Sequence, residues 1–183
     1  MTDVVSQKKI LRQQINDQKK LLTAEIRNRQ AKQVFDQLEQ QDTFIHSDHM
    51  LCYWSLPDEL PTHEFMNKWY RKKNFYLPKV VGVELSLHLY KGESSLSKGA
   101  YGIWEPTGAE LLQPEVIDVI IVPGVAFAAS GNRMGRGGGY YDRLLPKLQS
   151  AYKVGVGFNF QLVEGIPTEP HDINMDCVIT GRT

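Results

Sequence analysis

The sequence Val116-Ile117-Asp118-Val119-Ile120-Ile121-Val122 is a nearly continuous run of β-branched residues that stops at Pro123-Gly124. β-Branched side chains favour strands. A strand that is apolar on both faces is typical of a parallel sheet with helices on both sides. This run is therefore the strongest candidate for a buried strand at the centre of a sheet.

The segments on either side of this run alternate between helical and extended patterns. Residues 4–20 and 24–40 contain no Gly or Pro and place apolar residues at helical spacing, with Thr23 as a cap between them. Strands that alternate with helices predict an α/β fold with a mostly parallel sheet. The other predicted helices are Thr62–Lys73 and Tyr140–Gln149, the other predicted strands are Met50–Leu56, Asn74–Val81, Glu84–Tyr90, Lys153–Phe158 and Cys177–Thr180, and Lys91–Glu115 is predicted to be irregular.

Composition excludes several classes of protein. Lys+Arg and Asp+Glu both number 21, so the formal net charge is zero, which argues against a protein that coats nucleic acid or an anionic membrane. Two cysteines, Cys52 and Cys177, are too few for a disulfide scaffold or a Cys-rich zinc site. No apolar run approaches the ~18 residues of a membrane span. The N-terminal residues MTDVVSQKKILRQQ have no apolar stretch after their charges, so we do not expect them to act as a secretory signal. We expect a cytoplasmic protein of one domain.

Basic residues are concentrated in two places. Residues 1–33 contain eight Lys and Arg against three acidic residues, and residues 131–147 contain four against one. Two basic regions in a neutral protein suit a small anionic ligand better than a long polyanion. For the N-terminal lysines, a solvated helix face is the alternative interpretation.

The second basic region contains a glycine-rich loop, residues 131–142 (GNRMGRGGGYYD). Glycines let backbone amides approach phosphate oxygens, successive amides form an anion-binding nest, and Arg133 and Arg136 add forked donors. The loop is neither a Walker A motif nor G-x-G-x-x-G, because no Lys-Ser/Thr pair closes it and Tyr140 occupies the last glycine position. It is predicted to bind phosphate, with a flexible turn as the alternative.

Two further polar groups are candidates, one at the end of this loop and one far beyond it in sequence. Asp142 is suited to hold Mg²⁺ against bound phosphates, or alternatively to stabilise the first turn of a helix. His171-Asp172 follows Pro170 in a proline-rich segment, and from the residues alone it is interpreted as a loop turn.

Taken together, these segments resemble the 5-formyltetrahydrofolate cyclo-ligase (methenyltetrahydrofolate synthetase) family. The loop residues 131–142, preceded by Pro123-Gly124-Val125-Ala126-Phe127, resemble its glycine-rich signature. Four other segments agree with the family in order: Lys8-Lys9-Ile10-Leu11-Arg12, Ser55-Leu56-Pro57-Asp58-Glu59, Tyr101-Gly102-Ile103-Trp104-Glu105-Pro106 and Pro170-His171-Asp172. The resemblance covers nearly the whole chain. It implies a single-domain three-layer sandwich over residues 1–183, similar to sugar-phosphate isomerase and CoA-transferase-like folds, with the helical segment 4–40 packed on the sheet.

The resemblance also implies a set of site residues. At Trp54 the family usually carries an aliphatic or aromatic residue, and where this chain has Gly138 some members have Lys. The implied ATP contacts are Lys8, Arg12, Arg133, Met134, Gly135, Arg136, Gly137, Gly138, Gly139, Tyr140 and Tyr141; the substrate contacts are Arg12, Trp54, Glu59, Arg136, Gly137, Gly138, Gly139 and Tyr140; the catalytic residues are Arg133 and Arg136; and the magnesium ligands are Asp142 and Asp172.

The implied reaction is ATP- and Mg²⁺-dependent closure of 5-formyltetrahydrofolate to 5,10-methenyltetrahydrofolate by a monomer, with or without a polyglutamate tail on the substrate. Phosphoryl transfer depends mostly on positioning and charge neutralisation, which arginines, amides and Mg²⁺ supply. A sugar-phosphate isomerase-like enzyme is one alternative, excluded by ADP release that requires 5-formyltetrahydrofolate. A non-catalytic nucleotide- or RNA-binding module is the other, and tight, salt-sensitive RNA binding would support it.

Overall fold

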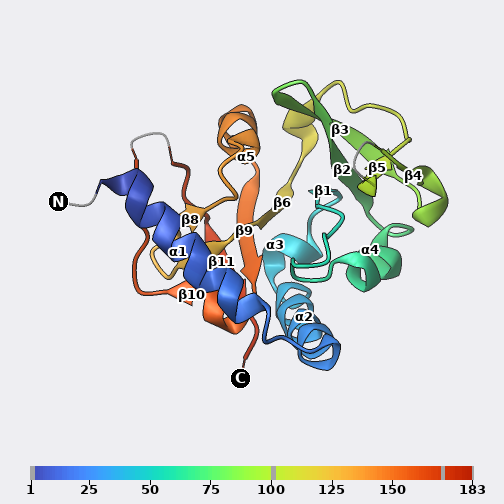
Figure 1. The fold of residues 1–183 in the computed structure, drawn as a ribbon. Coiled ribbons are helices and arrows are strands. Elements are labelled where there is room, and N and C mark those ends of the chain that lie inside the picture. The colour runs from blue at the N-terminus through green and yellow to red at the C-terminus, as the bar shows by residue number, and fades with distance from the viewer. Residues whose placement is uncertain (1–2, 100–101, 170–171, 183) are drawn as a thin grey trace.

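A computed structural model describes residues 3–99, 102–169 and 172–182 and centres on a six-stranded sheet (Figure 1). Neighbouring strands of this sheet are parallel in every pair but one, because β3 (Glu84–Tyr90) runs antiparallel to β2 (Asn74–Val81). The prediction of an α/β fold with a mostly parallel sheet is confirmed. The strand order is β11 (Cys177–Thr180), β9 (Tyr152–Gly157), β6 (Val119–Pro123), β1 (His49–Leu51), β2 (Asn74–Val81) and β3 (Glu84–Tyr90).

One face of this sheet is covered by α2 (Ala24–Leu38), α3 (Asp42–Ile45) and α4 (His63–Trp69). The Thr23 side chain accepts a hydrogen bond from the Ile26 amide, so the predicted cap begins α2. Apolar residues then recur every three or four positions and pack against the strands. The shared core includes Ala31, Val34, Phe35 and Leu38 of α2, Phe44 of α3, Phe65 and Met66 of α4, and Met50, Phe75, Val119, Ile121 and Val154 of the sheet.

The opposite face is covered by a short helix, α5 (Tyr140–Leu144), which continues as the 3₁₀ turn η4 (Leu145–Lys147). The predicted helix over residues 140–149 therefore ends early. Pro146 lacks the amide hydrogen that an α-helix needs at this point. Leu144, Leu145 and Leu148 still bury their side chains against β6 and its neighbours.

The N-terminal helix α1 (Val4–Lys19) packs on a smaller sheet of β10 (Leu162–Val163), β7 (Ala126–Ala128) and β8 (Arg133–Met134). Ile15 is buried there with Ala126 and Met134, whereas α2 packs on the central sheet. The strands β7, β8 and β10 are two or three residues long, which is too short for a periodic pattern to reveal them. The β7–β8 hairpin contains the first residues of the glycine-rich loop and leads the chain to its glycines at 135 and 137–139.

Several predicted boundaries are wrong, for identifiable reasons. The strand predicted over Met50–Leu56 stops at Leu51, because Ser55 turns to exchange hydrogen bonds with Thr62. The predicted start of β6 falls in a 3₁₀ turn, η3 (Pro114–Val116). The helix predicted over Thr62–Lys73 ends at Trp69. The region predicted to be irregular contains η1 (Glu93–Ser95), β4 (Leu96–Lys98) and β5 (Trp104–Pro106), and η5 (Asn159–Gln161) follows β9.

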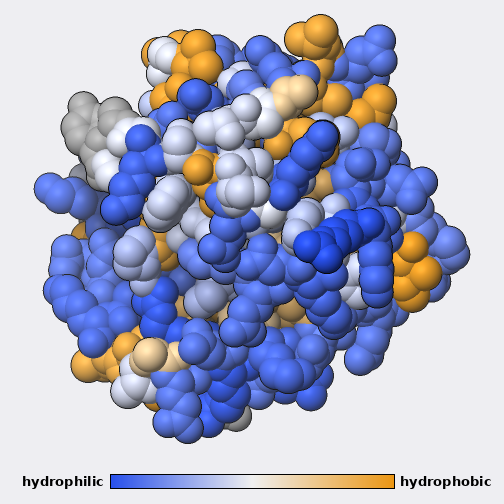
Figure 2. All heavy atoms as spheres, turned by 90° about the vertical axis from the view of Figure 1, so that its right-hand side faces the viewer, coloured by the Kyte–Doolittle hydropathy of each residue, from blue (hydrophilic) through white to orange (hydrophobic). Residues whose placement is uncertain are grey.

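Figure 2 shows the face on the side of β3, β4, β5 and α4 as mostly hydrophilic, with hydrophobic atoms of the described residues in separate patches. No helix in the described part of the chain combines the length and the apolar content that crossing a membrane requires.

Candidate functional site

A pocket of about 540 Å³ opens at the carboxyl ends of β1 and β6. From β1 the chain continues to β2 and β3 on one side of the sheet, and later to β6, β9 and β11 on the other. In open α/β sheets, ligands bind outside the strand ends at such a reversal of strand order. Tyr53 and Trp54 follow β1 into this pocket, and Pro123 and Gly124 lead out of β6.

All the site residues named from the sequence line this one pocket, although they come from four distant segments of the chain. The motif residues Tyr101, Pro170 and His171 lie outside the described residues. The pocket lining includes Lys8, Arg12, Trp54, Glu59, Arg133, Met134, Gly135, Arg136, Gly137, Gly138, Gly139, Tyr140, Tyr141, Asp142 and Asp172.

The glycine-rich loop presents unused backbone donors to the pocket. Gly137 and Gly139 have φ of +100° and +69°, in the left-handed region that favours glycine. Arg12 Nε donates to the Gly135 carbonyl at 3.0 Å and ties α1 to the loop. Within the described residues, the amides of residues 135–139 have no hydrogen-bond acceptor. The loop therefore has the donors that an anion of several oxygens requires.

Arg133 is buried and contacts Pro123, Asp142 and Tyr141. Its Nε donates to the Pro123 carbonyl at 2.9 Å, its Nη1 donates to Asp142 Oδ1 at 3.1 Å, and its guanidinium lies 5.3 Å from the centre of the Tyr141 ring. Burial lowers the pKa of Arg133, and the charge of Asp142 opposes that effect. Arg133 thus joins the end of β6 to the first turn of α5.

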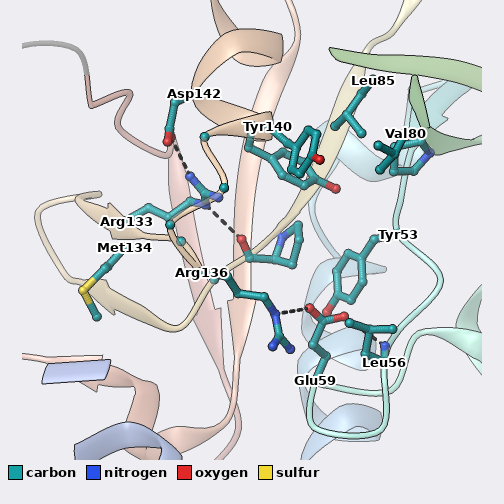
Figure 3. A pocket seen from close by; sticks show the side chains of 18 of the residues that line it. Tyr53, Leu56, Glu59, Val80, Leu85, Arg133, Met134, Arg136, Tyr140 and Asp142 are labelled. Atoms are coloured by element: carbon teal, nitrogen blue, oxygen red, sulfur yellow. Dashed lines mark hydrogen bonds and ion pairs between the residues drawn. The ribbon is translucent and has the colours of Figure 1, made fainter. Parts of the chain in front are cut away.

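Arg136 crosses the mouth of the pocket and points toward Glu59 (Figure 3). Its Nε donates to Glu59 Oε1 at 3.2 Å and its Nη2 to Asp58 Oδ1 at 2.6 Å, while Asp58 Oδ2 accepts from Lys19. Partial burial disfavours its charge, but the two carboxylates outweigh this and raise the pKa of Arg136. Glu59 Oε2 also accepts from the Leu56 amide, which fixes the carboxylate at the pocket edge.

Lys8 is paired with two acids of the C-terminal segment. Its Nζ lies 2.8 Å from Glu169 Oε2 and 2.9 Å from Asp172 Oδ2, and Asp172 also accepts from the Glu169 amide. Burial opposes the ammonium charge, but these two partners raise the pKa of Lys8. Sequence reasoning missed Glu169, which lies 161 residues from Lys8 along the chain.

The predicted metal ligands are placed in the pocket but are already engaged by cations. Asp142 faces Arg133, and Asp172 faces Lys8. No group of three or more His, Cys, Asp or Glu able to hold a metal occurs in the part of the chain that the structure describes. Asp142, one-third exposed beside the loop amides, still fits a metal that arrives with phosphate oxygens, since Mg²⁺ takes few protein carboxylates in such sites.

An apolar wall faces the glycine-rich loop, and sequence reasoning missed it. Val80 and Leu85 belong to the β2–β3 hairpin, Trp104 is the first residue of β5, and Ile103 precedes it. Tyr140 lies opposite Leu85 and Val80 in Figure 3. Only the fold brings these distant segments together. The arrangement suits a ligand with both aromatic and anionic parts.

Met134 and Tyr141 have distinct environments. The Met134 side chain is buried with Ile15, so only its backbone remains for a ligand. The Tyr141 hydroxyl is buried without a hydrogen-bond partner among the described residues. Burial raises the pKa of Tyr141, which leaves a neutral hydroxyl in the pocket wall.

Comparisons with known proteins point to one family. The family model described as "5-formyltetrahydrofolate cyclo-ligase family" matches residues 4–181. The Escherichia coli 5-formyltetrahydrofolate cyclo-ligase is 32% identical over 91% of this chain and 96% of its own length, and the Haemophilus influenzae protein of the same name is 33% identical over 73% and 75%. The NMR structure of Aquifex aeolicus 5,10-methenyltetrahydrofolate synthetase superposes with a TM-score of 0.85 at 36% identity, covering 94% of this chain and 89% of that one.

Proposed function

The chain belongs to the 5-formyltetrahydrofolate cyclo-ligase family and converts 5-formyltetrahydrofolate to 5,10-methenyltetrahydrofolate, and we propose that it does so with ATP and Mg²⁺ through phosphorylation of the formyl oxygen. We further propose that residues 1–183 act as one domain, as a cytoplasmic monomer on the mono- or polyglutamylated folate.

The proposed route follows from the chemistry of the substrate. The oxygen of a formyl amide is a poor leaving group. Transfer of the γ-phosphoryl group to that oxygen gives ADP and a formyl carbon that is open to attack. Nitrogen-10 then bonds to this carbon, loses its proton, and expels the oxygen as inorganic phosphate. No nucleophilic side chain is needed, and the protein's task is to orient the two substrates and neutralise charge.

One observation carries the proposal: a single pocket joins phosphate donors to groups suited to a pterin. The loop amides of residues 135–139 and the cations Lys8 and Arg12 surround one end. Glu59 lies at the other, where a carboxylate accepts paired hydrogen bonds from pterin nitrogens. Arg136 bridges the two ends, and it is released to the phosphates when a pterin takes its place on Glu59.

Asp142 and Asp172 are proposed to hold Mg²⁺ together with ATP oxygens. Asp172 is paired with Lys8 and would have to leave that ammonium to join the metal site, whereas Asp142 already lies beside the loop. Bound Mg²⁺ would neutralise negative charge on the phosphates. Glu59, Trp54 and the apolar wall orient the folate.

Labelled substrate tests the phosphorylation step. With oxygen-18 in the formyl group of 5-formyltetrahydrofolate, the label should appear in inorganic phosphate, one atom for each methenyl group formed. Unlabelled phosphate, with the label in water instead, would show that ATP does not activate the formyl oxygen. Omitting ATP provides the control for spontaneous ring closure.

Replacing Asp142 with Asn tests the magnesium assignment. Asn keeps the shape but loses the charge that attracts a hard cation, so half-maximal activity should need at least about tenfold more Mg²⁺ at saturating ATP. The free energy of unfolding should fall by about 2 kcal/mol, because the amide oxygen still accepts from Arg133 but the buried guanidinium loses its counter-charge.

The Mg²⁺ titration is repeated on Asp36→Asn, which removes the same charge from a surface pair with Lys32 outside the pocket lining. Its curve should match that of the unaltered protein. If the curve for Asp142→Asn coincides with the curves of Asp36→Asn and the unaltered protein, Asp142 does not hold the metal.

A further inference from the structure

The indole of Trp54 is stacked on a side chain that lies outside the pocket lining. The ring centres of Trp54 and His63 are 3.9 Å apart with an interplanar angle of 17°, and Tyr90 contacts the indole at 5.6 Å and 40°. Trp54 lines the pocket, whereas His63 is not among the lining residues. His63 is therefore placed as a backing for the pocket wall.

Hydrogen bonds hold the His63 ring in this position. Nε2 lies 3.2 Å from the Ser55 carbonyl and 3.1 Å from the Ser55 hydroxyl. A carbonyl only accepts, so Nε2 carries the hydrogen. Burial lowers the pKa of His63, which keeps the ring neutral near pH 7.

The backbone on both sides of the stacked pair is also fixed. The Ser55 amide donates to Thr62 Oγ1 at 3.2 Å, the Thr62 amide donates to Ser55 Oγ at 3.1 Å, and Thr62 Oγ1 donates to the Tyr53 carbonyl at 2.7 Å. Thr62, which precedes His63, is thus bonded to the two residues that flank Trp54 in the sequence, so the segment after β1 is joined to the start of α4. Rotation of the indole would have to break its stack on His63.

We propose that His63 is a positioning residue for the folate: by stacking on Trp54 it fixes the indole as one wall of the folate end of the pocket. The inference rests on the proposed function, which gives Trp54 a contact with the substrate. His63 itself touches no reacting atom. Its contribution is the orientation of Trp54, so its loss weakens folate binding and spares ATP binding and the chemical step.

Two substitutions separate stacking from hydrogen bonding. His63→Phe keeps an aromatic face against Trp54 and loses the bond to Ser55, whereas His63→Gln keeps an amide donor and loses the ring. An aromatic pair of this kind corresponds to about a threefold to tenfold change in an equilibrium constant. We expect His63→Gln to raise the KM for 5-formyltetrahydrofolate by about that factor, with kcat and the KM for ATP unchanged, and His63→Phe to stay within about twofold of the unaltered protein.

Calorimetric titration with 5-formyltetrahydrofolate in the absence of ATP supplies a readout that is independent of turnover. The dissociation constants should follow the same order as the KM values. In a double-mutant cycle, prior replacement of Trp54 with Leu should abolish the effect of His63→Gln on folate binding. The cycle remains informative if one variant is less stable, because it compares pairs in the same background.

Four results would overturn the inference: unchanged folate binding in His63→Gln, equal impairment of His63→Phe and His63→Gln, an equal rise in the KM for ATP, or a full additional loss in the Trp54→Leu background. Failure of the unaltered protein to convert 5-formyltetrahydrofolate contradicts the proposed function instead. Normal conversion, with folate binding unchanged in His63→Gln, contradicts only the role of His63.

Discussion

Replacing Arg136 with Ala is expected to lower kcat by about 10²–10³-fold, the range for removing one preorganised donor to a developing oxyanion. Its guanidinium now bonds to Asp58 and Glu59, and in the proposed reaction it moves to the transferring phosphoryl group. Its side chain is 48% exposed, so the melting temperature should change little. Steady-state turnover and a thermal melt measure the two effects.

Two further variants sharpen this test. Arg136→Lys keeps the charge without the planar fork and should recover part of the lost turnover. Arg71→Ala removes an exposed arginine that bonds to Tyr70 outside the pocket lining, and should leave kcat unchanged. Near-normal turnover in Arg136→Ala would remove Arg136 from the reaction.

Replacing Arg133 with Met is expected to lower the free energy of unfolding by about 3 kcal/mol, because removing one partner of a buried ion pair leaves the charge of the other uncompensated. The change leaves the Pro123 carbonyl and Asp142 without their donor. Asp142 is one-third exposed and gains hydration, so the loss should fall at the lower end of the range for buried pairs. Urea-induced unfolding at pH 7 measures it.

A double-mutant cycle separates the ion pair from simple loss of packing. In an Asp142→Asn background, Arg133→Met should cost less, because no charge is left uncompensated. Arg71→Met, an exposed counterpart, should change the unfolding free energy by less than about 0.5 kcal/mol. A cost for Arg133→Met as small as that would contradict a structural role for the buried guanidinium.

The elements with strong local patterns were predictable from the sequence. The hairpin strands Asn74–Val81 and Glu84–Tyr90 and the last strand Cys177–Thr180 have the predicted bounds. Residues 52–56 have the same apolar pattern as β1, but the hydrogen bonds of Ser55 with Thr62 turn them out of the sheet. The contact that decided this boundary spans 7 residues, beyond the apolar run itself, so the pattern of that run did not show it.

The candidate site divides in the same way. Its glycine-rich loop is contiguous in sequence, and glycines flanked by arginines pointed to it. Its apolar wall combines Val80, Leu85 and Trp104, which meet only in the folded chain. The pairing of Lys8 with Glu169 likewise joins residues at opposite ends of the sequence, beyond any spacing argument.

Formation of the methenyl product, followed by its absorbance, tests the central claim most directly. With 5-formyltetrahydrofolate and MgATP present, absorbance should rise and one ADP should form for each methenyl group. Omitting ATP or Mg²⁺ should abolish the rise. A rise of equal rate without MgATP, or no rise with it, would contradict an ATP-driven cyclo-ligase reaction in this pocket.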